Sequence, residues 1–313
     1  MNNNQKVFLF FSIVISFFFN HVKYYIEPKK ELYKHILKFV EGDIDYKTLT
    51  DFCDKFNLDD NKEEFKLSFK IVINIANNHH RHPNFIDNIE QIIVYYQDKM
   101  KSVFSNYGVF EIFKTNKLII LFLFERNIIK MDKRIYIDLI DIKEPNGIRY
   151  CNFFFPEIKR FVNEEEIKYI DIEVFENEIN QIVNFDEKRH IGENDSYLCL
   201  LIRQDRVDEF NVYTIQENIQ LTSKIKPSIF ETNAFLNENS PTLIEYAAFF
   251  GSIKIIKYLL TKNVEITQSL LLHSIHSKNF NLINFLLSNK NKLSKSKYAE
   301  LHNESIKCHH NYI

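Results

Sequence analysis

Histidine and cysteine are the side chains of this sequence with the clearest capacity for chemistry, and two short segments concentrate them. His79-His80-Arg81-His82 and Cys308-His309-His310 both offer groups that bind zinc in proteins. Adjacent residues of a helix point about 100° apart, so ligands for one ion are expected three or four residues apart. In the first segment only His79 and His82 have that spacing, and no cysteine or carboxylate lies within several residues of them. We interpret this segment as the end of a helix, where His and Arg meet exposed carbonyl groups before Pro83.

The second segment and a further histidine pair lead to the same expectation. Cys308, His309 and His310 are consecutive, so they project apart, and the repeat described below puts them at the end of a helix and its turn. His273 and His276 are three residues apart, but the repeat places His276 at the end of an inner helix. A polar contact there is favoured over metal binding. We predict no metal site and no cofactor.

An enzymatic role is also disfavoured by the glycines. They stand alone at positions 42, 108, 147, 192 and 251, so the sequence has no dinucleotide fingerprint, phosphate-binding loop or nucleophile elbow. The cysteines at 53, 151, 199 and 308 are far apart, and we expect them to be reduced and buried, as in a cytoplasmic protein. A metal-dependent or cysteine-dependent enzyme remains an alternative, because a Cys-His pairing is spatial and is not visible in a sequence.

Composition limits the fold class and the partners. The 313 residues include 40 basic and 42 acidic side chains, a balance that gives no general attraction to nucleic acid. A hydrophobic content of 45% with only 5 Gly and 6 Pro indicates a folded protein with few turns of the kind that β-sandwiches need. We predict an all-α fold.

The N-terminus carries an apolar run at Val7–Phe19, which is short for a membrane-spanning helix and has no small-residue cleavage site after it. Three interpretations remain open: a start codon assigned too far upstream, a signal peptide or anchor, and an ordinary buried helix. The second would make the protein membrane-tethered or secreted. We treat residues 1–22 as an apolar leader or misassigned start.

Helical patterns follow. Pro28 suits a first helical turn, and Gly42 ends the run that it begins. Further amphipathic stretches are predicted over residues 60–77, 84–104, 117–127 and 164–186, and the alternation within 136–150 fits either a strand or a short helix. Residues 23–190 thus form a helical N-terminal region of unknown function, with a boundary near 190.

Residues 191–313 contain repeated helix pairs. In the clearest one, Thr242 and Glu245 form a capping box, Ala247 and Ala248 keep the first helix thin, and Gly251 permits the turn into the second helix. Nine residues between Leu271 and Leu287 match this unit at a spacing of 27 residues. Weaker copies lie near residues 202–213 and 112–124. Ser305 and Ile306 are predicted to open the first helix of an incomplete further pair, which leaves a truncated C-terminus or an open apolar end face.

Asparagine takes the place of glycine at other turns of this region. We expect Asn116, Asn263 and Asn279 at such turn positions, because Asn tolerates the left-handed conformation best after Gly.

The unit at 242–260 resembles the ankyrin repeat, with Leu243-Ile244 in place of its Pro-Leu and Asn263-Val264 in place of its Gly-Ala. From about Lys23 onward, the chain resembles a trichomonad-type family of ankyrin-repeat proteins that carries a domain of unknown function. The segments behind this resemblance are residues 77–85, 113–117, 227–233, 242–260 and 305–311. The resemblance implies a binding scaffold and no catalytic residue.

We therefore predict a non-enzymatic scaffold that binds another protein through the concave side of a helix-pair solenoid. The expected contacts lie near the start of each inner helix and in the loop before it: Asn239, Thr242, Glu245, Tyr246, Thr267, Ser269 and His273. Rigid stacked repeats hold such a surface in its binding conformation. We do not expect nucleic acid as a partner. A membrane is expected as a partner only if residues 7–19 are a genuine anchor.

Overall fold

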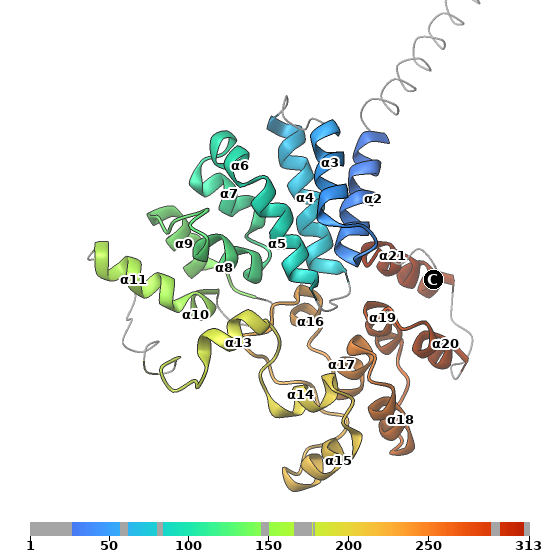
Figure 1. Ribbon diagram of the computed structural model, residues 1–313. Helices are drawn as coiled ribbons and strands as arrows, with labels where there is room; N and C mark the ends of the chain where they lie inside the picture. Colours follow the sequence, from blue (N-terminus) through green and yellow to red (C-terminus); the bar gives the residue numbers. More distant parts are fainter. Residues whose placement is uncertain are drawn as a thin grey trace, which may run out of the picture. The chain divides into compact units, whose positions relative to one another are not determined.

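The protein is all-α. The computed structural model describes residues 27–56, 62–79, 84–144, 150–165, 177, 179–288 and 295–309 (Figure 1). Within these ranges no strand forms, and an isolated β-bridge joins Lys224 to Thr242. No helix in them has the length and apolar character required to cross a bilayer. The predicted leader at residues 1–22 lies outside the described residues.

The chain divides into two compact units. The N-terminal unit comprises the described residues up to Asn74 and those between 82 and 99, and the C-terminal unit comprises 75–81 and the residues from Met100 onward. The boundary predicted near 190 does not coincide with this division. Lys188 pairs with Asp195 at 2.9 Å, and the Asn237 side-chain amide donates to Glu144 at 3.2 Å, so side chains from both sides of that position pack together in one unit.

The helices of the N-terminal unit match the predicted stretches with two exceptions. They are α2 (Glu27–Glu41), α3 (Tyr46–Phe56), most of α4 (Lys62–Asn78), α5 (Phe85–Tyr95) and the start of α6 (Gln97–Val103). The exceptions are that α3 was not predicted and that two helices, α5 and α6, share the stretch over 84–104. Leu32, Ile36 and Phe39 of α2 are buried, as their helical spacing predicts. The Asn88 side-chain amide donates to the carbonyl oxygens of Phe39 and, at 3.3 Å, Val40, which fastens α5 to the end of α2.

The C-terminal unit contains the remaining helices. In order they are α7 (Asn106–Phe113), α8 (Lys117–Glu125), α9 (Lys133–Asp141), α10 (Tyr150–Phe153), α11 (Phe155–Glu165), α13 (Phe185–Ile191), α14 (Tyr197–Arg203), α15 (Val207–Gln216), α16 (Ala234–Asn239), α17 (Leu243–Phe250), α18 (Ile253–Thr261), α19 (Gln268–His276), α20 (Phe280–Ser288) and α21 (Lys295–Lys307). The ambiguous alternation after residue 136 is helical in α9. Much of the amphipathic stretch predicted over 164–186 lies outside the described residues.

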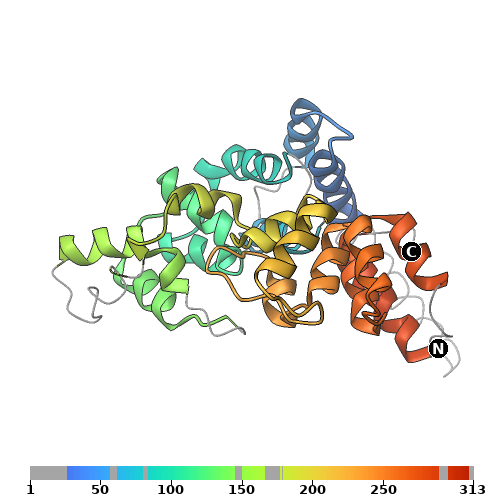
Figure 2. The same ribbon diagram turned by 90° about the horizontal axis from the view of Figure 1, so that it is seen from below.

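The predicted helix pairs are present as α14 with α15, α17 with α18, and α19 with α20. The first members of the pairs also pack on one another, α14 on α17, α17 on α19 and α19 on α21 (Figure 1). In the second view, the helices from yellow through orange to red again lie side by side (Figure 2). We call α14, α17, α19 and α21 the inner helices.

Small residues allow α17 and α19 to lie close together. Ala247 and Ala248 of α17 are fully buried, and so is Ser274, which matches Ala247 in α19. The residue that matches Ala248 is the larger Ile275, which is 1% exposed. The capping box of Thr242 and Glu245 is present. On α18, Ile255, Ile256 and Leu259 are fully buried.

Residues in the left-handed conformation end the helices of these pairs. Each of the inner helices is followed by one, namely Asp205, Gly251, Lys278 and His309, with φ between 52° and 73°. Asn218 and Asn263 occupy the same conformation after α15 and α18. The prediction was right for Asn263 and wrong for Asn116 and Asn279. These two cap helices instead, since their side chains accept the N–H groups of Ile119 and Leu282.

The last inner helix begins earlier than predicted. Ser305 and Ile306 lie in the last turn of α21, which starts at Lys295, so they do not open it. Helices α19 and α21 start 27 residues apart, at Gln268 and Lys295, but the left-handed residues that follow them, Lys278 and His309, are 31 apart. Helix α21 is therefore longer than α19 at its C-terminal end, and Ser305 and Ile306 lie in the added turn.

Candidate functional site

Polar side chains join the starts of α17 and α19 to each other and to the middle of α21 in what we call the polar row. The Glu245 carboxylate of α17 accepts from the Thr242 backbone N–H at 2.8 Å and from its hydroxyl at 2.9 Å. Its other oxygen accepts from the Thr267 hydroxyl at the start of α19, at 3.5 Å. Next along the row, the Gln268 side-chain amide donates to Glu300 of α21 at 2.7 Å. Helices α17 and α19 therefore present their N-terminal ends on one side, next to the middle of α21.

Glu245 is ionised in this arrangement. Burial acts to raise the pKa of its carboxyl group, but the hydrogen bonds from Thr242 and the proximity of His273 outweigh burial and lower it. The negative charge also lies at the N-terminus of α17, where the helix dipole favours it.

The seven predicted contact residues divide by exposure. Asn239 and Thr267 are exposed, and Thr242 and Ser269 are half-buried. Glu245, Tyr246 and His273 are buried. Gln268 and Glu300 extend the accessible row to α21. The sequence analysis missed Glu300 because the start of α21 was misplaced, and it did not name Gln268 although Thr267 and Ser269 flank it.

Tyr246 joins two inner helices instead of facing solvent. Only 1% of it is exposed, and its hydroxyl accepts from the Arg203 guanidinium of α14 at 3.0 Å. Burial raises the pKa of Tyr246 well above its ordinary value. Arg203 in turn pairs with Glu193 at 2.7 Å. A partner could not contact the Tyr246 side chain in this structure.

His273 is also part of the interior. Its Nδ1 atom lies 2.7 Å from the Ser269 carbonyl oxygen, and its buried Nε2 atom has no hydrogen-bond partner within the described chain. Burial lowers the pKa of His273, although Glu245 opposes that shift. The histidine is therefore neutral near pH 7.

The first histidine-rich segment lies where a helix ends. Helix α4 stops at Asn78, and the His79 N–H donates to the Ile75 carbonyl oxygen at 2.9 Å. The His79 ring stacks on that of His309, with centroids 6.1 Å apart. His80, Arg81 and His82 lie outside the described residues.

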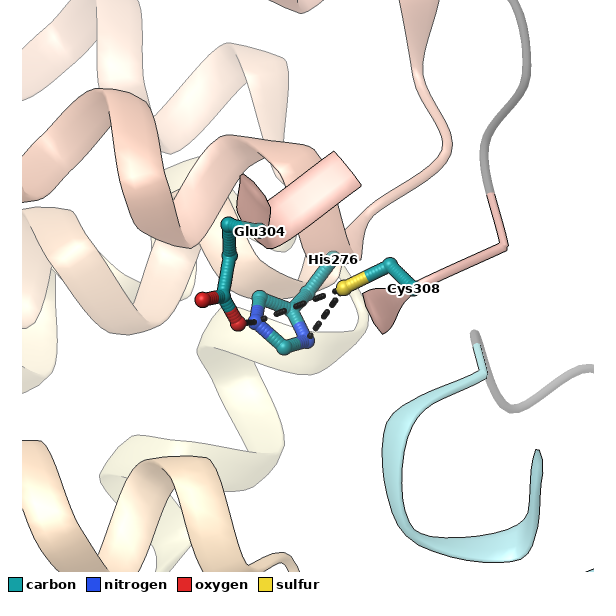
Figure 3. A group of neighbouring side chains, drawn as sticks. All are labelled: His276, Glu304 and Cys308. Atoms are coloured by element: carbon teal, nitrogen blue, oxygen red, sulfur yellow. Dashed lines mark hydrogen bonds and ion pairs between the residues drawn. The ribbon is translucent and has the colours of Figure 1, made fainter. Parts of the chain in front are cut away.

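The structure brings together three side chains of the types that bind metal ions, those of His276, Glu304 and Cys308 (Figure 3). Cys308 follows the last residue of α21, as the predicted turn position required, and its sulfur lies 3.4 Å from Nδ1 and 3.6 Å from Nε2 of His276. Glu304, one turn earlier on α21, accepts from His276 Nε2 at 3.1 Å. Sequence reasoning compared neighbours in the chain, and His276 is 32 residues from Cys308. A search at the 27-residue repeat spacing does not find the pair, because the spacing between the ends of the inner helices increases to 31 residues before Cys308.

The four cysteines are reduced and buried, as predicted. Burial raises the pKa of the Cys53 and Cys308 thiols, and it raises that of Cys199 to about 11. Reactive cysteines are thiolates in accessible, electropositive surroundings. These three thiols have the opposite environment.

Comparisons with known proteins give no family. A scan against protein-family models, a search of curated proteins and a search of solved structures each found no match. The resemblance to ankyrin-repeat proteins stays a prediction.

Proposed function

We propose that the chain is a protein-interaction scaffold whose inner helices form an ankyrin-like, solenoidal stack. The observation that carries the proposal is the polar row that joins the starts of α17 and α19 to the middle of α21. Side chains on neighbouring helices hold one another there, so a partner would meet a surface that is ordered before binding. Association then loses less conformational entropy.

The contact surface of the proposal consists of the accessible part of that row. Asn239 and Thr267 are exposed, and Gln268 is partly so. Glu300 adds an exposed carboxylate on α21. The surface is mainly uncharged and rich in hydrogen-bonding groups, which suits a partner that presents backbone and amide groups more than one that presents a large apolar patch. Tyr246 and His273 support this surface from beneath.

Two doubly substituted variants test the proposal with matched chemistry. In Asn239→Arg/Thr267→Arg, bulky cations block the proposed surface. In the control, Thr261→Arg/Asn281→Arg, the same types of residue change at exposed positions of α18 and α20. Proximity labelling in the native cells, with the intact chain as bait, identifies the neighbours of each form, and direct binding of purified candidates follows.

We expect a direct partner whose affinity falls at least about tenfold with the first variant and is unchanged with the control. Far-UV circular dichroism establishes that both variants fold. A partner that binds both variants as well as the parent chain contradicts the assignment of the surface. Absence of any direct protein partner contradicts the scaffold function itself.

A further inference from the structure

His276, Glu304 and Cys308 form a buried cluster that the proposed scaffold function does not use. His276 is the last residue of α19, while Glu304 and Cys308 are four residues apart on α21 and its end, and thus share one face. All three are buried, with exposed fractions of 2%, 8% and 0%. In Figure 3 the imidazole lies between the carboxylate and the sulfur.

Two of the three separations between the ligand atoms match those around one metal ion. Nε2 of His276 lies 3.1 Å from Glu304 Oε1 and 3.6 Å from Cys308 Sγ, and one donor atom from each residue lies within 4.8 Å of the others. In a tetrahedral zinc site, bond lengths of about 2.0 Å to nitrogen or oxygen and about 2.3 Å to sulfur separate nitrogen from sulfur by about 3.6 Å and nitrogen from oxygen by about 3.3 Å. The two separations from His276 Nε2 are within a few tenths of an ångström of these values.

Neighbouring side chains orient two of the ligands. The His276 ring packs against those of Phe235 and Phe249, with centroid distances of 4.0 and 5.0 Å. Lys307 donates to Oε2 of Glu304 at 3.0 Å, which leaves Oε1 directed toward His276. Such outer contacts are a regular part of protein metal sites, because they fix the ligands before the ion arrives.

The same three residues could instead form a Cys-His-Glu nucleophilic triad, but the environment disfavours that chemistry. Cys308 is fully buried, so a substrate has no route to its sulfur in this structure. A metal ion has no such requirement after binding, and it deprotonates a thiol that it coordinates. Thiolate and carboxylate together would balance the charge of a divalent ion, which matters in a buried site.

A small cavity lies beside His276, although Glu304 and Cys308 do not line it. It has a volume of about 20 Å³ and is lined by His276, His79, Glu193 and Glu231, among others. That volume suffices for one water molecule. Three protein ligands and one water are a common coordination set for zinc.

We infer that His276 Nε2, Glu304 Oε1 and Cys308 Sγ bind one zinc ion, with water as the fourth ligand. The mixed nitrogen, oxygen and sulfur set is typical of zinc and is too soft for magnesium or calcium. On binding, the Cys308 thiol loses its proton to solvent, and the proton on His276 Nε2 moves to Nδ1. Zinc thereby replaces the hydrogen bond between His276 and Glu304 and joins α19 to α21.

The test uses the intact chain, stripped with a chelator and titrated with Zn²⁺ or Co²⁺ alone. We expect one equivalent to bind, and Co²⁺ to give the near-ultraviolet absorption of a thiolate-to-cobalt charge transfer. Cys308→Ser should abolish that absorption, and Glu304→Gln should weaken binding at least about tenfold. Cys151→Ser and His302→Gln are the matched controls, since they remove a buried cysteine and an exposed α21 histidine outside the cluster.

Two cluster variants, Cys308→Ser and Glu304→Gln, are used so that the inference can still be refuted if one of them misfolds. Glu304→Gln preserves the size of the side chain, and circular dichroism reports folding independently of metal. Lack of stoichiometric Zn²⁺ binding by the parent chain overturns the inference. Unchanged affinity in a folded cluster variant, or loss of the charge-transfer band in Cys151→Ser instead of Cys308→Ser, overturns it as well.

Discussion

Two glycines of the C-terminal unit have the same backbone conformation but different surroundings, and alanine should therefore affect them unequally. Gly192 and Gly251 follow α13 and α17 with φ values of 67° and 73°. A Cβ atom at Gly251 would meet Ser277 Cβ at 3.4 Å, an ordinary contact. At Gly192 it would lie 2.8 Å from both methyl carbons of Leu118, which is buried.

These distances set the expected free energies of unfolding. The left-handed conformation costs an L-residue about 1–2 kcal/mol, and the smaller entropy of the unfolded alanine chain offsets about 0.4–1 kcal/mol of it. Gly251→Ala should thus destabilise the unit by about 1 kcal/mol. Gly192→Ala carries the same strain and must also displace Leu118, which adds about 1–3 kcal/mol.

Urea denaturation followed by far-UV circular dichroism measures both variants, because the chain has no tryptophan for fluorescence. Leu118→Ala in the Gly192→Ala background isolates the steric part. If Leu118 is the obstacle, the double variant should lose at least about 0.5 kcal/mol less than the sum of the single losses. Equal losses for Gly192→Ala and Gly251→Ala, or full additivity with Leu118→Ala, would refute the reasoning.

Two further predictions concern buried charge. Lys117 and Glu144 form an ion pair at 2.7 Å, and their side chains are only 2% and 8% exposed. In urea denaturation, Lys117→Met should lower the free energy of unfolding by about 3–5 kcal/mol because it leaves the Glu144 charge buried without the Lys117 cation, and Lys117→Met/Glu144→Leu should lower it distinctly less. A double variant as unstable as the single variant would contradict this prediction. Burial and the proximity of His276 lower the pKa of His273 in the folded state, against the opposing effect of Glu245, so the unfolded state binds the proton first as pH falls. The free energy of unfolding should then decrease as pH falls below about 6.5, by at most about 1.4 kcal/mol per pH unit from this residue. His273→Phe should reduce the slope of the free energy of unfolding against pH between about pH 7 and 5, measured on metal-free protein. An unchanged slope would contradict the prediction.

Local signals predicted the helix pairs because each depends on a few neighbouring residues. Thr242 and Glu245 are three residues apart and satisfy one helix end between them, and Gly251 is the residue best suited to the left-handed turn that follows. Ile255, Ile256 and Leu259 are buried because their spacing puts them on one face. None of these features needs information from elsewhere in the chain.

Other features depend on which helices meet, and the sequence did not determine that. Asn116 and Asn279 have the residue type of a left-handed turn, yet the same amide can accept the N–H of a helix start, and the structure uses it so. Tyr246 has the position of a surface contact in the repeat, but Arg203 of α14 lies against its hydroxyl and the ring is enclosed. The cluster at His276 was hidden for a related reason, since the spacing between inner-helix ends changes from 27 to 31 residues before Cys308.

The proposed surface and the proposed metal site use opposite ends of α19, so each can fail without the other. Thr267 caps the start of the helix and His276 ends it, nine residues later, which corresponds to about 14 Å along the axis. The arginine substitutions at Asn239 and Thr267 therefore leave the metal ligands untouched, and Glu304→Gln leaves the exposed row untouched. The two sites are nevertheless connected mechanically, because both join α19 to α21: Gln268 meets Glu300 at one end, and His276 meets Glu304 and Cys308 at the other. An ion that fixes the distal contact would hold the two helices in register and so keep Gln268 and Glu300 aligned, which gives a buried metal site a structural purpose in a binding scaffold.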